Sequence, residues 1–229
     1  MKKLSLFTAS LSATILLASC SNTPLLVSQP MPKSGFLPNY SLLVPTGTSV
    51  QDVRLWRYRI AGVNPNTYTA VILEPIELKQ NVTQSVSLAT INQAKASLQA
   101  SMVEAVNARG NIRIVTKPGL GVARISVGIT GAESSADSLQ PWNFTPIGLA
   151  MNAAAYAGGV NSKTPALVVE SKITDSKSNE LLGEGLAVVQ GESFRTAAGS
   201  VDSFIAMTKK IVLASLEASA SPIPTSLKQ

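Results

Sequence analysis

The chain has 229 residues, of which 45% are hydrophobic, and 19 basic against 13 acidic residues give it a formal net charge of +6. It contains no histidine and one cysteine, which excludes an ordinary Ser–His–Asp triad, a histidine-ligated metal and an intrachain disulfide. The mild, scattered charge excess argues against a nucleic-acid partner, and the length suits one domain with a sizeable core. We expect no cofactor and no metal.

Residues 1–19 have the layout of a secretory signal. Lys2 and Lys3 form a positive start, and a short apolar run follows them. The run is too short to span a bilayer, which needs about 20 apolar residues, and small residues precede the expected cleavage point. The sequence therefore predicts an exported protein from which this segment is removed.

The end of the signal, Leu17, Ala18, Ser19 and Cys20, resembles a bacterial lipobox, in which the cysteine is diacylated and becomes the first residue of the mature protein. A catalytic thiolate would want a histidine or a cationic pocket nearby, and a structural cysteine would belong inside a domain. We predict lipidation of Cys20, with the acyl chains as the membrane anchor. Because Ser21 rather than aspartate follows, resemblance to sorted Gram-negative lipoproteins implies the outer membrane, with the domain facing the periplasm.

Residues 20–33 are rich in serine, proline and asparagine and are predicted to be a tether between the lipid and the domain. Residues 34–43, with the sequence SGFLPNYSLL, follow this tether and are called the strap from here on. Two interpretations stay open for the strap: a cover for the core, or a surface that binds a partner. Its larger side chains are Phe36, Leu37, Tyr40 and Leu42, of which the first three are candidate partner-binding residues.

Residues 54–60, with the sequence RLWRYRI, alternate apolar side chains with arginines. This period of two predicts an edge-like strand or an extended segment. Interleaved aromatic and arginine side chains could stack on nucleic-acid bases, but the simpler interpretation puts the apolar face inward and the arginines in water. Trp56 is a further candidate partner-binding residue.

The middle of the chain alternates strand and helix patterns. Residues 67–78 form a near-continuous apolar run, which predicts a central strand. Residues 85–109 have apolar side chains at helical spacing, and Gly110 follows as a C-terminal cap. Residues 111–117 and 122–130 then predict a hairpin.

Residues 131–165 show little strand character and are predicted to be a long insertion. Their apolar, small-residue middle favours a helical lid packed on the domain over a membrane-facing segment. Whether the insertion is a lid, an interface or membrane-facing stays open. Its aromatic residues Trp142 and Phe144 are candidate partner-binding residues.

The C-terminal part predicts a second hairpin over residues 166–191 and an amphipathic helix over 200–218 with Ser200 as its N-cap, followed by a loose tail over 221–229. Taken together, residues 34–220 are predicted to be one α+β domain. Its mixed, mostly antiparallel sheet of about five strands carries two long helices, in the order β-α-β-β-(insertion)-β-β-α.

Several short motifs occur in a characteristic order: Ser34-Gly35-Phe36-Leu37, Tyr40-Ser41 with Leu43, Trp56-Arg57, Tyr68 before AVILEPIEL, and the acidic turn over 175–182. Their order resembles a bacterial lipoprotein family known only as domain of unknown function number thirty-three thirteen. One departure is Ser178-Asn179-Glu180, where a Thr-Gly-Glu turn is expected; asparagine can replace glycine in a left-handed conformation. The family has no established activity, so the resemblance implies a lipoprotein domain and names no catalytic residue.

No catalytic motif of the G-x-S-x-G, S-x-x-K or phosphate-loop type occurs. Glu74 with Glu77, or Glu180 with Glu184, could form the carboxylate pair of a hydrolase, but solvated charges are the simpler interpretation. The sequence favours a non-catalytic binding or accessory protein of the cell envelope, whose partner is another envelope protein or the cell wall. The alternatives are an oligomeric accessory subunit of secretion or transport, and a carboxylate-based envelope hydrolase; the oligomeric state stays open.

Overall fold

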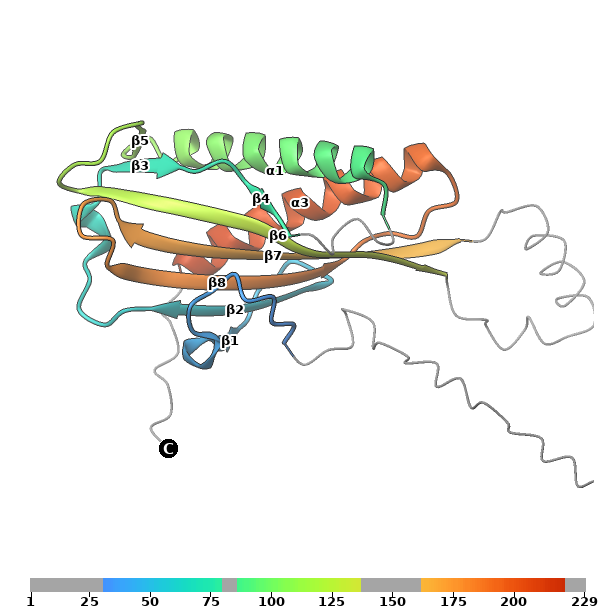
Figure 1. Cartoon of the computed structure of the whole chain (residues 1–229), viewed down its shortest axis with the longest axis horizontal. Coiled ribbons are helices and arrows are strands. Elements are labelled where there is room, and N and C mark those ends of the chain that lie inside the picture. Colours follow the sequence, from blue (N-terminus) through green and yellow to red (C-terminus); the bar gives the residue numbers. More distant parts are fainter. Residues whose placement is uncertain (1–30, 80–85, 137–161, 221–229) are drawn as a thin grey trace, which may run out of the picture.

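The computed structural model describes residues 31–79, 86–136 and 162–220 (Figure 1). These residues form one open sheet with two long helices on one face, so the predicted α+β class is confirmed. Several predicted features lie outside the described residues: the signal peptide, the lipobox with Cys20, residues 20–30 of the tether, Trp142, Phe144 and the tail over 221–229. Neither described helix has the length and apolar character needed to cross a membrane.

The sheet is mixed and mostly antiparallel, with eight strands in the described part of the chain instead of about five. The strands are β1 (Val44–Thr46), β2 (Val53–Arg59), β3 (Ala70–Leu73), β4 (Glu77–Leu78), β5 (Arg113–Ile114), β6 (Val122–Ala136), β7 (Lys163–Asp175) and β8 (Leu181–Gln190). Their spatial order is β1-β2-β8-β7-β6-β3-β5, and β4 pairs with β6. The parallel pairs are β3 with β5, β3 with β6 and β4 with β6, while the other pairs are antiparallel.

Helix α1 (Leu88–Ala108) confirms the predicted helix over 85–109. The side-chain oxygen of Ser87 accepts a hydrogen bond of 3.1 Å from the Thr90 N–H, which caps the free donors of the first turn. Gly110 follows the last turn with a φ of 68°, the left-handed conformation in which glycine carries no steric penalty.

Helix α3 (Ala197–Ala220) begins earlier than residue 200, so the assignment of Ser200 as its N-cap was wrong. The side chain of Thr196 takes that role and accepts a hydrogen bond of 3.0 Å from the Gly199 N–H. Ser200 already lies in the first turn and donates its N–H to the Thr196 carbonyl. A short polar segment before the apolar stripe offers several capping residues, and the structure uses the earlier one.

The main core lies between the sheet and the two helices (Figure 1). Its fully buried side chains include Ile91, Leu98, Ile129, Leu167, Phe204 and Met207. Within this layer, the hydroxyls of Ser97 on α1 and Thr208 on α3 lie 3.0 Å apart and form a hydrogen bond. Both helices therefore cover the same face of the sheet, which leaves the opposite face to other parts of the chain.

The hairpin predicted over 111–117 and 122–130 is wrong. Strands β5 and β6 do not pair with each other, because β3 lies between them and is parallel to both. The turn over 118–121 has the local sequence of a hairpin turn, but it connects β5 to β6, which lie on either side of β3. Strand β3 is consequently next to the edge of the sheet, not central as predicted.

The predicted insertion over 131–165 is shorter than expected, because strands occupy both of its ends. Strand β6 continues to Ala136, and β7 already begins at Lys163, where the two pair. The later hairpin predicted over 166–191 is confirmed as β7 and β8. In its turn Asn179 has a φ of 60°, the left-handed conformation expected when asparagine replaces glycine.

Strand β2 is not an edge strand, because β1 pairs along its outer side. Its alternation also differs from the simple interpretation of arginines in water. Trp56 and Tyr58 face the side of the sheet away from the helices. Arg57 faces the helices, where its guanidinium donates to the backbone carbonyl of Ala218 near the end of α3. This cation therefore satisfies a free carbonyl at a helix C-terminus.

Candidate functional site

The strap lies on the sheet face opposite the helices, where Figure 1 shows the blue N-terminal segment. Phe36 and Leu37 are 7% and 4% exposed, and Leu43 is buried with them. They pack on Val168 of β7 and on Leu186 and Val188 of β8, against which Met31, Tyr40, Trp56 and Tyr58 also pack. The strap thus covers a second, smaller core.

Tyr40 joins the strap to the sheet through its hydroxyl group. The oxygen accepts backbone N–H donors from Ser34, Gly35 and Phe36 at 3.0, 2.8 and 3.2 Å. The same hydroxyl donates a hydrogen bond of 2.6 Å to a carboxylate oxygen of Glu170 on β7. One phenol group therefore closes the turn of the strap and ties it to a buried charge.

The Phe36 ring packs on the sheet where Gly128 of β6 has no side chain. A Cβ atom at Gly128 of β6 would lie 2.8 Å from the Phe36 ring, closer than side chains approach in folded proteins. The Lys172 ammonium lies 5.2 Å from the centre of the same ring, within the range of a cation–π contact. The bare backbone at Gly128 and the cation at Lys172 together position this ring.

Glu170 is fully buried, at 0% exposure, but its carboxylate is hydrogen-bonded. Besides the bond from Tyr40, it accepts a hydrogen bond of 2.7 Å from the Thr130 hydroxyl. Two hydroxyl donors offset the cost of removing the carboxylate from water.

Glu184 on β8 is the second buried carboxylate on this face, and it is 4% exposed. Neither carboxylate oxygen has a hydrogen-bond partner of ordinary geometry among the described residues. Burial raises the pKa of Glu184 above its usual value, and the nearby charge of Glu170 raises it further, while the Asn39 N–H and Lys172 act in the opposite direction. The site therefore holds one satisfied and one poorly compensated carboxylate.

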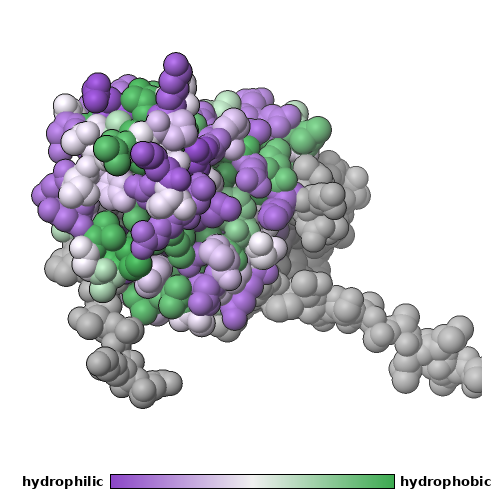
Figure 2. Space-filling view, turned by 60° about the vertical axis from the view of Figure 1, so that its left-hand side comes forward, coloured by the Kyte–Doolittle hydropathy of each residue, from purple (hydrophilic) through white to green (hydrophobic). Residues whose placement is uncertain are grey.

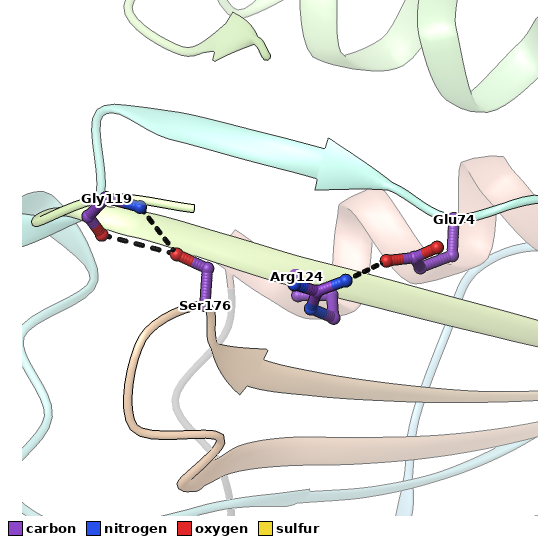
Figure 3. A network of polar contacts seen from close by, with 4 residues as sticks. All are labelled: Glu74, Gly119, Arg124 and Ser176. Atoms are coloured by element: carbon purple, nitrogen blue, oxygen red, sulfur yellow. Dashed lines mark hydrogen bonds and ion pairs between the residues drawn. The ribbon is translucent and has the colours of Figure 1, made fainter. Parts of the chain in front are cut away.

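The glutamates of the two predicted carboxylate pairs, Glu74 with Glu77 and Glu180 with Glu184, have separate environments in the structure. Glu74 forms an ion pair with Arg124 (Figure 3), and Glu77 is exposed on β4. Glu180 is exposed in the turn before β8, whereas Glu184 is buried under the strap. The carboxylates that lie near each other are Glu184 and Glu170, and Glu170 was not among the predicted site residues. Its position at the end of the apolar run ALVVE was the available signal.

A separate polar contact joins two turns at one end of the sheet (Figure 3). The Ser176 hydroxyl accepts a hydrogen bond of 3.1 Å from the Gly119 N–H and donates one of 3.2 Å to the Gly119 carbonyl. Leu120 in the same turn is 88% exposed. Figure 2, which brings this end of the molecule forward, shows hydrophobic patches interspersed with hydrophilic atoms.

Of the six predicted partner-binding residues, four lie in the described parts of the chain and two, Trp142 and Phe144, lie outside them. Phe36, Leu37 and Tyr40 belong to the strap and pack inward. Trp56 is half-buried beside them, with the Arg54 guanidinium 5.3 Å from the centre of its ring. Within the described ranges no cluster of three or more acidic or cysteine side chains could hold a metal.

The chain belongs to the family described as protein of unknown function DUF3313, which matches residues 32–212. No curated protein matches it. Three solved structures are similar. The PelC dodecamer from Paraburkholderia phytofirmans is 7% identical, and the match covers 70% of this chain and 96% of that chain with a TM-score of 0.36. For the protein XCC0632 from Xanthomonas campestris the identity is 10%, the coverage 70% and 88%, and the TM-score 0.41, and for the lipoprotein GNA1162 from Neisseria meningitidis the identity is 10%, the coverage 60% and 93%, and the TM-score 0.33.

Proposed function

We propose that this protein is a lipid-anchored lipoprotein of the outer membrane that faces the periplasm and has a non-catalytic binding or accessory role in the cell envelope. The observation that carries the proposal is the lipobox: Leu17, Ala18 and Ser19 precede the single cysteine, Cys20, at the end of a signal-like segment. The family match begins at residue 32, shortly after this motif.

The anchor follows from simple energetics. Each methylene group buried in the bilayer contributes about 0.8 kcal/mol, and two or more acyl chains hold a protein stably on a membrane. The residues between Cys20 and the strap are rich in serine, proline and asparagine, a composition suited to a flexible spacer. The domain would therefore stay close to the membrane surface while it turns to meet a partner.

The roles of the acidic residues support a non-catalytic function. Glu74 is neutralised by Arg124, and Glu170 is held by Tyr40 and Thr130 beneath the strap. The hydrolase alternative has one observation in its favour: Glu170 and Glu184 lie close enough to interact, and Glu184 has a raised pKa, a pattern that is common in catalytic sites. The strap side chains, however, occupy the sheet face on which a substrate would have to lie.

The partner we propose is another envelope protein or the cell wall. Among the candidate contact residues, the half-buried Trp56 lies at the margin of the strap cluster, and aromatic and arginine side chains such as Trp56 and Arg54 are enriched in binding interfaces. Crosslinking in native envelopes with a photoreactive residue at Arg54 would test this surface. A protein that forms no adduct there while remaining membrane-bound would argue against it.

The anchor is tested by comparing Cys20→Ala with Ser19→Ala. The first variant removes the sulfur that carries the lipid, so we expect no incorporation of labelled palmitate and no cleavage of the precursor. The second keeps a small residue before the cleavage point, so labelling and membrane fractionation should match the unaltered protein. Normal labelling of the Cys20→Ala variant would contradict the proposed anchor.

A further inference from the structure

The strap is held on a face that contains an unbalanced buried charge. Glu184 lies on β8 directly opposite Lys172 on β7 and directly opposite Tyr58 on β2. Its two carboxylate oxygens are shielded from water and lack hydrogen-bond partners of ordinary geometry within the described residues. A buried carboxylate in this condition costs free energy as long as it stays charged.

Each element packed around Glu184 contributes a group that faces it. Strand β7 contributes the carboxylate of Glu170 and the ammonium of Lys172, β2 contributes Tyr58, and the strap contributes the backbone N–H of Asn39. Glu184 therefore lies near one acidic group, Glu170, and one cation, Lys172, and that cation is also in contact with the Phe36 ring of the strap. The balance of charge is best when one of the two carboxyl groups carries a proton.

Among the described elements packed around Glu184, the strap is the one that can relieve this imbalance without breaking the sheet. β7 and β2 are fixed to β8 by continuous ladders of backbone pairs. The strap, in contrast, is attached to β7 through the Tyr40 hydroxyl and through side-chain packing. If the strap lifts, water reaches both carboxylates, and their charges become less costly.

We propose that the strap is a proton-controlled latch, which is closed tightly while Glu184 is protonated and loosens when Glu184 becomes charged beside Glu170. Protonation removes one negative charge from the buried pair and leaves Glu170 with its two hydroxyl donors, Tyr40 and Thr130. Loss of that proton favours the open position, in which the carboxylates are hydrated and Tyr40 is released from Glu170.

The direction of the pH dependence follows from linkage. Burial gives Glu184 a higher pKa when the strap is closed than the ordinary value of 4.5 that it would have in water. The closed strap is therefore favoured most below that ordinary value, and this preference is lost as pH rises through the raised pKa. Each unit by which the pKa is raised corresponds to about a tenfold change in the ratio of closed to open strap.

Opening would have two consequences for the protein. It would uncover the apolar side chains of Val168, Leu186 and Val188, together with Trp56. It would also add the ten strap residues to the spacer, an extra reach of about 35 Å when extended. The second consequence rests on the proposed lipid anchor, whereas the latch itself does not.

Hydrogen exchange of the strap amides in the full mature chain tests the latch. The Phe36 and Leu43 N–H groups are hydrogen-bonded to Tyr40 in the closed strap, and amides inside α1 serve as an internal reference. We expect protection of the strap amides, corrected for intrinsic exchange, to fall over a pH range that begins at the ordinary glutamate value of 4.5 and extends upward, while α1 stays protected. Equal protection of the strap across this range would overturn the proposal, whether or not Cys20 is lipidated.

Matched variants assign the effect to Glu184. Glu184→Gln should keep the strap protected at the upper end of the pH range and remove the pH dependence, whereas Glu104→Gln, which removes an exposed charge on α1, should behave as the unaltered chain does. If Glu184→Gln does not fold, Lys172→Met serves as the second test. Lys172 lowers the pKa of Glu184, so loss of this cation should make the loosening of the strap larger and extend it to higher pH. A Glu184→Gln or Lys172→Met protein with the unaltered pH profile would overturn the latch.

Discussion

Tyr40 and Glu170 are 130 positions apart in the sequence and are joined by a hydrogen bond of 2.6 Å from the phenol to the carboxylate. The contact links the conspicuous motif SGFLPNYSLL to a glutamate in the middle of strand β7. Because the same phenol oxygen also accepts the N–H groups of the preceding turn, the tyrosine determines both the shape of the strap and its attachment.

Removal of this hydroxyl should destabilise the domain. In Tyr40→Phe, Glu170 loses one of its two hydroxyl donors while remaining buried, and hydrogen bonds to charged groups are worth about 1.5–3 kcal/mol. Urea unfolding should show a loss of that size in the free energy of unfolding. Tyr68→Phe is the matched control, because its hydroxyl bonds to the solvent-accessible Asp175, and its loss should be smaller. Equal losses in the two variants would contradict the role assigned to Tyr40.

A methyl group added under the strap should displace the Phe36 ring. In Gly128→Ala the new Cβ would lie 2.8 Å from that ring, and overpacking of this kind costs about 1–3 kcal/mol. Thermal unfolding should therefore occur at lower temperature than in the unaltered chain. Gly47→Ala provides the comparison, since a Cβ there meets nothing within 4 Å. A Gly128→Ala protein as stable as Gly47→Ala would show that the ring is not seated as described.

Asn179 should tolerate glycine better than alanine. Its φ of 60° is a left-handed conformation that asparagine adopts readily and that costs a residue with an ordinary Cβ about 1 kcal/mol or more. We expect Asn179→Gly to leave the free energy of unfolding nearly unchanged and Asn179→Ala to lower it by about that amount. Chemical denaturation of both variants side by side makes this comparison, and a preference for alanine would contradict the assigned turn geometry.

The pKa values of three carboxyl groups should be shifted in opposite directions, downward for Asp175 and Glu217 and upward for Glu184. Hydrogen bonds from the Ser178 and Lys177 backbone lower the pKa of Asp175, and those from Ser49 and Thr48 lower the pKa of Glu217. Their contribution to stability is therefore present above their ordinary values of 3.8 and 4.5 and is lost as pH falls through the lowered pKa values.

Glu184 should show the reverse behaviour, because its pKa is raised and its charged form is the unfavourable one. Carbon-13 NMR of the side-chain carboxyl groups, followed through an acid titration, resolves the individual groups. We expect Glu184 to gain its proton at higher pH than Asp175 and Glu217 do. The opposite order would remove the electrostatic basis of the latch.

The helices and the last hairpin could be predicted because their signals are local. Apolar spacing of the helical kind identified both helices, and the glycine after α1 ended it where expected. The pairing of β3 with β5 and β6 could not be predicted, since parallel partners are separated by a helix and leave no turn motif between them. The end of β6 was missed because Gly131 to Ala136 lack β-branched residues, and pairing with β7 overrides that weak propensity.

The site was predictable only in part. The aromatic residues of the strap were singled out by their composition and motif order, but not the side chains under them. Glu170 sits at the end of an apolar run, and nothing nearby in the sequence indicates that Tyr40 supplies its hydrogen bond. Glu184 was grouped with Glu180 by sequence spacing, whereas strand alternation places Glu184 under the strap and the turn leaves Glu180 exposed. Long-range contacts of this kind follow from topology.

The central claim, that Cys20 anchors this domain to a membrane, is tested most directly by mass spectrometry of the N-terminal peptide of the protein isolated from its native envelope. We predict a chain that begins at Cys20 and carries a diacylglycerol group on the sulfur, with residues 1–19 removed. A chain that retains those residues with an unmodified Cys20 thiol, or one that is cut at another position, would contradict the account.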